Sequence, residues 1–409
     1  MIYFDNAATT RTLPVAVDEM LPYFTQYYGN ASTVYELGQE SRNAIRTAKI
    51  AAAALLHAEL REVCFTSGAS ESNNQAIKGA ALRAAEEKGI FPIGGGNGRS
   101  RQMPHIITTK IEHSSVLMPL RALERMGFSV TYLQVDENGL LDPDVLRRAI
   151  RPETVLISVM AANNEIGTIQ PIARIGEIAR SQGILFHTDA VQAFGQIPLD
   201  VREMKIDLLS ASSHKLYGPK GAGLLYIRSG VSILPLIDGG SQEFGFRAGT
   251  ENIPALVGFG KAMQLAREDM KERIGHLCML RDLLVERIFR EIPDVVLNGF
   301  DPRGDVHYFA QRRLPGNVNF CFQGADGESL AALLDREEIA VSAGSACSTG
   351  STEPSHVLLA IGRGREEAKS ALRLSLGIYN TVEEIDEVVK VLGQITSRLR
   401  SRNPLYHLS

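Results

Sequence analysis

The stretch Leu208-Leu209-Ser210-Ala211-Ser212-Ser213-His214-Lys215 ends an apolar run in a group of polar side chains, and Gly218-Pro219-Lys220-Gly221 then leads into a second apolar run. Short apolar runs bounded by glycine and proline are typical of buried strands. Similar runs recur upstream, with amphipathic stretches such as Ser115–Met126 and Ile172–Gln182 between several of them. The predicted strands are Val63–Thr66, His105–Thr109, Ser129–Leu133, Val155–Met160, Ile184–His187, Leu208–Ala211 and Gly223–Ile227. This alternation predicts an α/β fold with a mainly parallel sheet covered by helices on both faces.

The pattern changes after about residue 260, and a chain of 409 residues is too long for one ordinary core. A long helix from Lys261 to about Arg290 is expected first. Strands at Val295–Leu297, Asn317–Phe322, Ala340–Ser342 and Ala371–Leu376 should follow, with helices near Glu328–Glu337 and from Val382. We therefore predict a large domain over residues 14–258 and a smaller α+β domain formed by residues 1–13 and 259–409. Residues 88–103, which contain Gly94-Gly95-Gly96-Asn97-Gly98-Arg99, look like a surface insertion and lack the Gly-Lys-Ser/Thr of a P-loop.

Composition excludes several classes of partner. The net charge of −4 gives no electrostatic footprint for nucleic acid or an anionic membrane. No apolar run approaches the roughly 20 residues that span a bilayer, and Met1–Asn6 lacks the features of a signal peptide. No Gly-x-Gly-x-x-Gly follows an early strand, which argues against a nicotinamide-binding dehydrogenase. We expect a cytoplasmic protein that binds neither nucleic acid nor membrane.

The four cysteines differ in their surroundings. Cys64 and Cys321 lie in strand-like runs and are expected to be buried, and Cys278 lies in a helical stretch. Cys347 lies in the small, polar run Ser342–Ser351, which predicts an exposed loop. No Cys-x-x-Cys pair occurs, so neither a structural zinc site nor a disulfide framework is expected.

Polar residues follow several of the predicted strands, at the sheet edge where ligands bind in folds of this kind. A turn with Ala69 and Ser70 opens a helix and suits a phosphate, although Ser70 could equally be a plain N-cap. His113 and Asn164 follow two later strands, in places where structural roles are also common. Asp189, closing an apolar strand, needs a polar partner such as a pyridinium N–H. Lys215 could form a Schiff base with a carbonyl cofactor, with Lys220 as the rival.

Together these segments resemble the cysteine desulfurases of the NifS/IscS type, which depend on pyridoxal phosphate (PLP) and belong to the class V aminotransferase superfamily. The resemblance runs from Phe4–Thr10 to Ser370–Asn380 and is most specific in five blocks. These blocks are Phe65–Asn74, Ala162–Pro171, Thr188–Ala193, Ser212–Gly221 and Ser342–Ser355. It implies the aspartate-aminotransferase-like fold, with a seven-stranded sheet in the large domain.

The resemblance also implies roles for individual residues. Lys215 would hold PLP, Asp189 would keep the pyridine nitrogen protonated, and His113 would stack on the ring and move protons. Gln192 would bind the phenolic oxygen, and Asn164 would orient the adduct of cofactor and substrate. The phosphate would be held by Ala69, Ser70, Ser212, His214 and, from the other subunit of a homodimer, Thr250. Arg373 would bind the substrate carboxylate with its planar fork.

The implied reaction converts L-cysteine to L-alanine and leaves the sulfur on Cys347 as a persulfide, for iron–sulfur cluster assembly or other sulfur trafficking through an acceptor protein. No resident metal is implied, although Cys347 could contact an iron–sulfur cluster transiently. A selenocysteine lyase or another class V enzyme would keep Lys215 and Asp189 without needing Cys347. A non-catalytic assembly scaffold fits poorly with an intact set of cofactor residues.

The sequence departs from the family pattern in places that leave Lys215, Asp189 and Cys347 intact. Asn30-Ala31-Ser32 replaces the common Asn-Pro-Ser, and Tyr35 stands where histidine is frequent. Ser70 replaces the usual threonine, and Phe244 and Phe246 occupy positions that are often arginine. These departures concern the substrate entrance and the partner surface.

Overall fold

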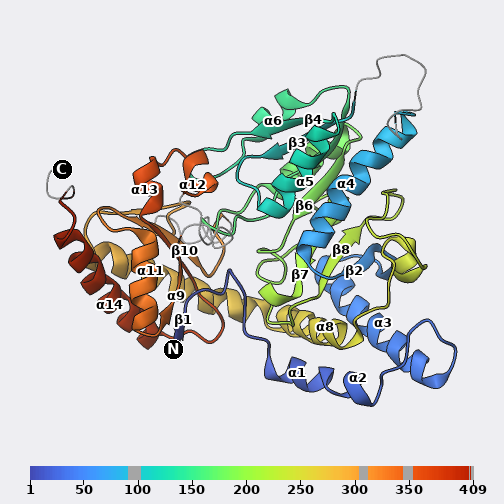
Figure 1. Cartoon of the computed structure of the whole chain (residues 1–409), viewed down its shortest axis with the longest axis horizontal. Coiled ribbons are helices and arrows are strands. Elements are labelled where there is room, and N and C mark those ends of the chain that lie inside the picture. The colour runs from blue at the N-terminus through green and yellow to red at the C-terminus, as the bar shows by residue number, and fades with distance from the viewer. Residues whose placement is uncertain (91–102, 304–311, 344–352, 405, 407–409) are drawn as a thin grey trace.

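Seven strands form the central sheet of the larger lobe in the computed structural model, which describes residues 1–90, 103–303, 312–343, 353–404 and 406 (Figure 1). Their order across the sheet is β2 (Val63–Thr66), β8 (Gly223–Ile227), β7 (Leu208–Ser212), β6 (Leu185–Asp189), β5 (Thr154–Ser158), β3 (His105–Thr109) and β4 (Ser129–Leu133). The five strands from β7 to β4 are parallel, whereas β8 runs antiparallel to both of its neighbours. The predicted mainly parallel, seven-stranded sheet is confirmed.

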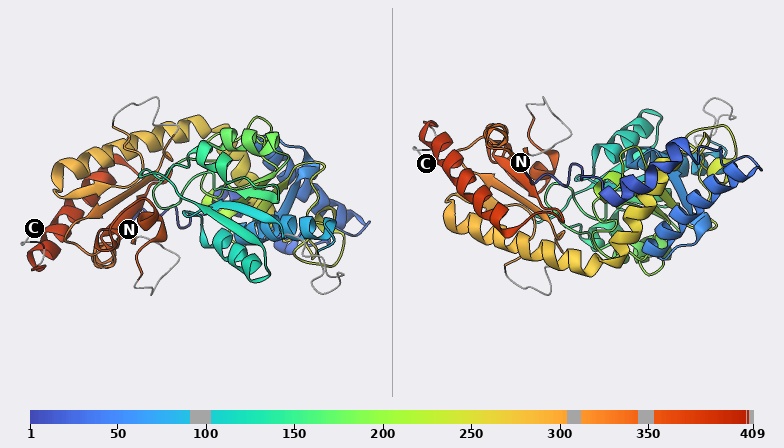
Figure 2. Two further views of the ribbon diagram at one scale, coloured as in Figure 1. Left: turned by 90° about the horizontal axis from the view of Figure 1, so that it is seen from above. Right: turned by 90° about the horizontal axis from the view of Figure 1, so that it is seen from below.

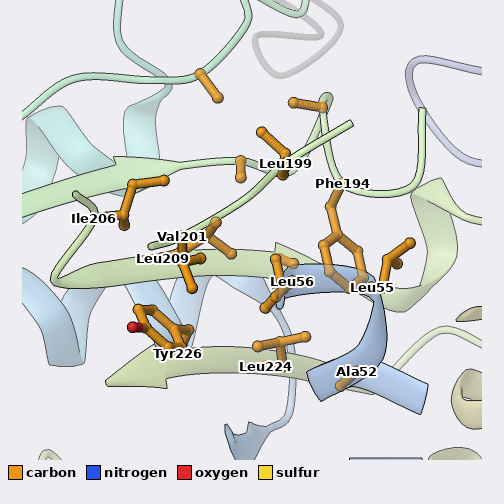
Figure 3. Close-up of a cluster of buried hydrophobic side chains, with 14 of the residues drawn as sticks. Ala52, Leu55, Leu56, Phe194, Leu199, Val201, Ile206, Leu209, Leu224 and Tyr226 are labelled. Carbon is orange, nitrogen blue, oxygen red and sulfur yellow. The ribbon is translucent and has the colours of Figure 1, made fainter. Parts of the chain in front are cut away.

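Both faces of this sheet are buried, which explains why its strands read as nearly continuous apolar runs. Successive side chains point to opposite faces, so Val63 and Phe65 join one cluster whereas Cys64 joins the other. The first face is covered by α3 (Glu36–Leu56), α6 (Pro143–Ala149), α7 (Ile172–Ser181) and α8 (Ile253–Glu268). The second face is covered by α4 (Ala69–Glu87) and α5 (Ser114–Arg125). Figure 3 shows Leu56 of α3 beside Leu209 and Leu224 in the first cluster, and Leu55 beside Phe194.

The smaller lobe has its own antiparallel sheet and its own apolar cluster. The strand order is β12 (Ser342–Ala343), β13 (Ala371–Ser375), β10 (Asn317–Phe322) and β9 (Val295–Leu297), and β1 (Ile2–Tyr3) pairs separately with β11 (Ile339–Ala340). Its helices are α9 (Met270–Glu291), α11 (Gly327–Arg336), α12 (His356–Ala360), α13 (Arg365–Lys369) and α14 (Val382–Ser401). The short helices α1 (Pro14–Met20) and α2 (Pro22–Thr25) lie on the larger lobe, where both contact α8.

Two predicted elements of the second half were wrong in detail. The long helix expected from Lys261 is two helices, α8 and α9, which meet at Asp269, where φ is −114° and ψ is 19°. The break separates helices that bury their side chains in different lobes, and Figure 2 shows the chain passing from one lobe to the other through them. The strand expected at Ala340–Ser342 is divided at Val341, because its first part pairs with β1 and its second part with β13.

Strand β8 lies close to the turn that opens α4, and glycine makes this approach possible. A Cβ on Gly223 would lie 2.6 Å from the Cα of Gly68, so any larger residue would force the strand and the turn apart. Gly68 is the N-cap residue of α4, which makes this contact part of the frame of the site described below. Among the described residues, no helix is long and apolar enough to cross a membrane.

Candidate functional site

A cavity of about 600 Å³ lies at the carboxyl ends of the central strands, between the two lobes. Its walls come from the large sheet, the first turn of α4, the N-terminal segment Ala7–Thr9 and Arg373 of β13. Ten of the residues predicted from the sequence line it: Ala69, Ser70, His113, Asn164, Asp189, Gln192, Ser212, His214, Lys215 and Arg373. Thr250 is exposed and does not line the cavity of its own chain. Cys347 and Gly94–Arg99 lie outside the described residues.

Lys215 ends the short 3-10 turn Ser213–Lys215 that directly follows β7. Its Nζ donates to the carbonyl oxygens of Ala7, at 2.6 Å, and of Ala8, at 2.5 Å. The Ala7 carbonyl also accepts from Nε2 of Gln192, at 3.0 Å. The N-terminal segment therefore holds two predicted cofactor residues from the same side. Lys220, the rival lysine, is exposed and lies at the edge of the same cavity.

Asp189 is the last residue of β6 rather than a residue beyond it, because its backbone pairs with Ser210 of β7. It is 5% exposed. One carboxylate oxygen accepts from Nδ2 of Asn73, at 2.7 Å, and the other from the backbone N–H of Val191, at 3.1 Å. Both donors are neutral, so neither supplies the positive charge that a pyridinium nitrogen would bring to the carboxylate.

The part of the cavity formed by the first turn of α4 suits a phosphate. The first turn of α4 presents N–H groups that have no partner within the helix, and the hydroxyls of Ser70 and Ser212 lie beside it. Burial and, after it, the charges of Lys215 and Lys220 lower the pKa of His214 to about 4. His214 is therefore neutral at pH 7, and its Nδ1 lies 3.1 Å from Oγ1 of Thr9.

Arg373 is 1% exposed, and its guanidinium is only partly satisfied. Nη2 donates to a carboxylate oxygen of Asp5, at 2.8 Å, and Nη1 donates to the carbonyl oxygen of Asn164, at 3.2 Å. Within the described residues its Nε has no hydrogen-bond partner although it is buried. A buried donor of this kind, at the wall of a cavity, suits the carboxylate of a small substrate.

This set of residues fits PLP and an amino acid. The cavity offers an amine for an aldehyde, a carboxylate for a ring nitrogen, and hydroxyl and helix N–H groups for a phosphate. The partly unsatisfied guanidinium of Arg373 lies in the wall of the same cavity.

The cysteines of the described region have settings that suppress reactivity. Cys64 and Cys321 are buried, as predicted, and burial raises the pKa of both thiols, to about 11 for Cys321. Burial also raises the pKa of Cys278, which is partly exposed on α9. Thiols with raised pKa values are poor nucleophiles at neutral pH. Among the described residues there is no group of three or more side chains suited to hold a metal ion.

Sequence reasoning missed three residues of the site. Asp5 holds Arg373, and Asn73 and Ser115 connect Asp189 with His113. Asp5 belongs to the conspicuous run Phe4–Thr10, but its partner is 368 residues away. Asn73 and Ser115 lie in helices, and no local sequence pattern identifies the residues that they contact in the fold.

We expect Asp5→Ala to lower the free energy of unfolding by about 3 kcal/mol, because it leaves the buried guanidinium of Arg373 without its carboxylate. Urea unfolding measures this loss. The matched control is Glu286→Ala, which removes one side of an exposed ion pair with Arg290 and should cost less than about 1 kcal/mol. Equal costs for the two variants would contradict the view that the Asp5–Arg373 pair is buried.

Comparisons with known proteins agree with this geometry. A family model described as aminotransferase class-V matches residues 2–388. The chain is 49% identical, over 405 residues, to a protein of Clostridium botulinum (strain Hall) named cysteine desulfurase IscS, covering 99% of this chain and 96% of that protein. A solved structure titled NifS-like protein has a TM-score of 0.85 at 36% identity, covering 97% of this chain and 99% of that one. Another, titled SspA in complex with cysteine, has a TM-score of 0.77 at 36% identity, covering 93% and 100%.

Proposed function

Because the chain belongs to the cysteine desulfurases of the class-V aminotransferase family, which depend on PLP, we propose that its cavity binds PLP and L-cysteine and that the sulfur of the substrate is passed to Cys347. The observation that carries the proposal is the meeting of Lys215, Asp189 and Arg373 in one cavity. They come from the 3-10 turn after β7, from β6 and from the smaller lobe.

Lys215 would attach PLP covalently through Nζ, and Asp189 would accept a hydrogen bond from the ring nitrogen. PLP, when bound, withdraws electrons from the α-carbon of the substrate. Ala69, Ser70, Ser212 and His214 would hold the phosphate, since the helix end and the two hydroxyls converge there. Gln192 would contact the phenolic oxygen.

Arg373 would bind the substrate carboxylate, with Nε as the donor still available within the described residues. Asn164 would orient the substrate, because its carbonyl oxygen is already held by Arg373, at 3.2 Å, and by Nδ2 of Asn317, at 3.1 Å. His113 would move protons on the substrate. When the amine of Lys215 is not attached to PLP, it would donate to the carbonyl oxygens of Ala7 and Ala8, as it does in this structure.

The sulfur transfer takes place at Cys347. Its thiolate would attack the sulfur of the substrate, so that an S–S bond forms while the bond between that sulfur and the β-carbon breaks. The electron pair of the broken bond stays with the carbon, which takes up a proton, and the products are L-alanine and a persulfide on Cys347. The raised pKa values of Cys64, Cys278 and Cys321 support this choice of cysteine.

Two copies of the chain would form the functional unit, with Thr250 completing the phosphate site of the partner. The exposed position of Thr250, away from its own cavity, supports this arrangement. An acceptor protein, such as an iron–sulfur scaffold, would then take the persulfide sulfur.

We also propose that the chain divides into a large domain, residues 14–258, and a smaller domain, residues 1–13 with 259–409. The separate apolar clusters of the two lobes support this division, although α8 still packs on the cluster of the larger lobe as far as Ala266.

Mapping the persulfide tests the proposal directly. After the PLP-loaded protein is mixed with L-cysteine and its thiols are blocked by alkylation, peptide mass spectrometry should find one added sulfur on Cys347. The peptides that carry Cys64, Cys278 and Cys321 serve as internal controls and should carry no added sulfur. An added sulfur on Cys278, with none on Cys347, would overturn the assignment.

A further inference from the structure

A continuous line of hydrogen bonds joins Asp189 to His113 along the wall of the cavity, where Ser115 also lies. Nδ2 of Asn73 lies 2.7 Å from Oδ2 of Asp189 and 2.8 Å from Oγ of Ser115. The same Oγ lies 2.8 Å from Nδ1 of His113, which also accepts from the backbone N–H of Ser115 at 3.1 Å. Asn73 is fully buried in α4, which lies beside α5 on the same face of the large sheet (Figure 1).

Chemistry fixes the direction of every bond in this line. An ionised carboxylate only accepts, so the amide nitrogen of Asn73 donates one N–H to Asp189 and has its second N–H for Ser115. The Ser115 oxygen therefore accepts from Asn73, which leaves its hydroxyl hydrogen to be donated to Nδ1 of His113. The backbone N–H of Ser115 donates to the same nitrogen, so Nδ1 of His113 accepts from both the hydroxyl and the N–H of Ser115.

We propose that Asn73 and Ser115 are positioning residues that keep His113 neutral with its proton on Nε2, and that they tie this state to the ionised form of Asp189. A proton on Nδ1 would face the N–H of Ser115 and would turn the hydroxyl into an acceptor for two donors. This line of hydrogen bonds from Asp189 to His113, called the relay below, thus disfavours the doubly protonated imidazole ring and selects one neutral tautomer. The inference rests on the proposed function only in placing Asp189 and His113 at the cofactor.

The relay provides a physical link between two roles in the reaction. Asp189 has to stay ionised to hold a protonated ring nitrogen, and a proton on Oδ2 of Asp189 would face the N–H of Asn73 and weaken the first bond of the line. His113 has to present a defined nitrogen to the proton that it moves. Among the described residues, the titratable or charged groups near His113 include the buried Glu112 and Glu165, and Lys215 and Arg373 in the same cavity. The test variants leave all four unchanged.

Ser115→Ala in the PLP-loaded enzyme tests the proposal. With cysteine as substrate, kcat should fall about tenfold while KM stays within about twofold, because the variant alters the protonation of His113 and no contact to substrate. The hydroxyl stabilises only the neutral ring, so its removal should move the acid limb of the kcat profile to higher pH by about half a unit to one unit. In protein labelled with ¹⁵N-histidine, the nitrogen resonances of His113 should show protonated Nε2 in the wild type and a mixed state in the variant.

Two further variants separate this role from a general structural one. Ser115→Thr keeps the hydroxyl and should restore the pH profile and the nitrogen resonances. Ser114→Ala, at an exposed position one residue earlier in α5, should match the wild type in every measurement.

Wild-type nitrogen resonances and an unshifted pH profile in Ser115→Ala would overturn the proposal. So would loss of bound PLP in Ser115→Ala with normal PLP content in Ser114→Ala, because the relay would then serve binding rather than protonation. Failure of the proposed function itself would look different, since the wild type would then neither bind PLP nor consume cysteine.

Discussion

Lys215→Ala is expected to abolish the visible absorbance of covalently bound PLP and to lower the rate of alanine formation from cysteine by at least about a thousandfold. In the proposed mechanism the amine of Lys215 would both attach the cofactor and be released beside the reacting carbon, and alanine supplies no amine for either role. Nζ of Lys215 donates to the carbonyl oxygens of Ala7 and Ala8, and these neutral acceptors position the side chain. Absorbance of the purified protein and quantification of alanine measure both effects.

The matched control is Lys220→Ala, which removes the exposed lysine at the edge of the same cavity. This variant should keep the visible absorbance, because the turn that carries Lys220 lies beyond the end of β7. The assignment of Lys215 is wrong if the two variants show the opposite pattern. A wild-type protein that stays colourless with added PLP would refute the proposed cofactor altogether.

Cys347→Ser is expected to keep the absorbance of bound PLP and to reduce sulfide release from cysteine to the background rate. A serine hydroxyl is almost entirely protonated at neutral pH, and an oxygen in its place carries no persulfide. The variant therefore separates binding of cofactor and substrate, which the described cavity provides, from removal of sulfur. Sulfide release and alanine formation should be measured on the same samples, with absorbance as the check on PLP content.

Cys278→Ser is the control for this experiment, because Cys278 is the partly exposed cysteine of the described region. It should retain normal turnover, since burial raises the pKa of its thiol. If Cys347→Ser still formed alanine and sulfide at the normal rate, the persulfide mechanism would be excluded. A selenocysteine lyase or another class V activity would then account better for the presence of Lys215 and Asp189 in the cavity.

The sequence predicted the sheet better than it predicted the connections around it. The bounds of β2, β3, β4 and β8 match the predicted runs. Strands β2, β3 and β8 are buried along their whole length, whereas the edge strand β4 is only partly buried. Asp189 shows the limit of this prediction. Its charge suggested that the strand had ended, but pairing with Ser210 keeps its backbone in the ladder. The break at Asp269 carries no glycine or proline signal, so only packing on two different lobes reveals it.

The site was predictable from the sequence where the type and position of a single residue indicate its chemical role. Lys215, Asp189 and Arg373 are costly to bury, so their places at strand ends or within apolar runs are informative from the sequence alone. Asn73 and Ser115 are different, because their roles depend on neighbours from three separate elements. Asn73 is 116 positions from Asp189 and 42 positions from Ser115 in the chain. Proximity of this kind follows from the tertiary fold and not from any local pattern.

The short segment Asp5–Thr10 contacts site residues from both the middle and the far end of the sequence, and this has a consequence for biosynthesis. Its contacts reach His214 and Lys215 in the middle of the chain, and Arg373 and Ser375 near its end. Ala7 and Ser375, for example, are 368 positions apart. These residues leave the ribosome long before their later partners, and their contact with Ser375 must wait until that residue has been translated. A nascent chain with a folded large domain thus still lacks Arg373 and Ser375, and the site reaches its final form only after both have been translated.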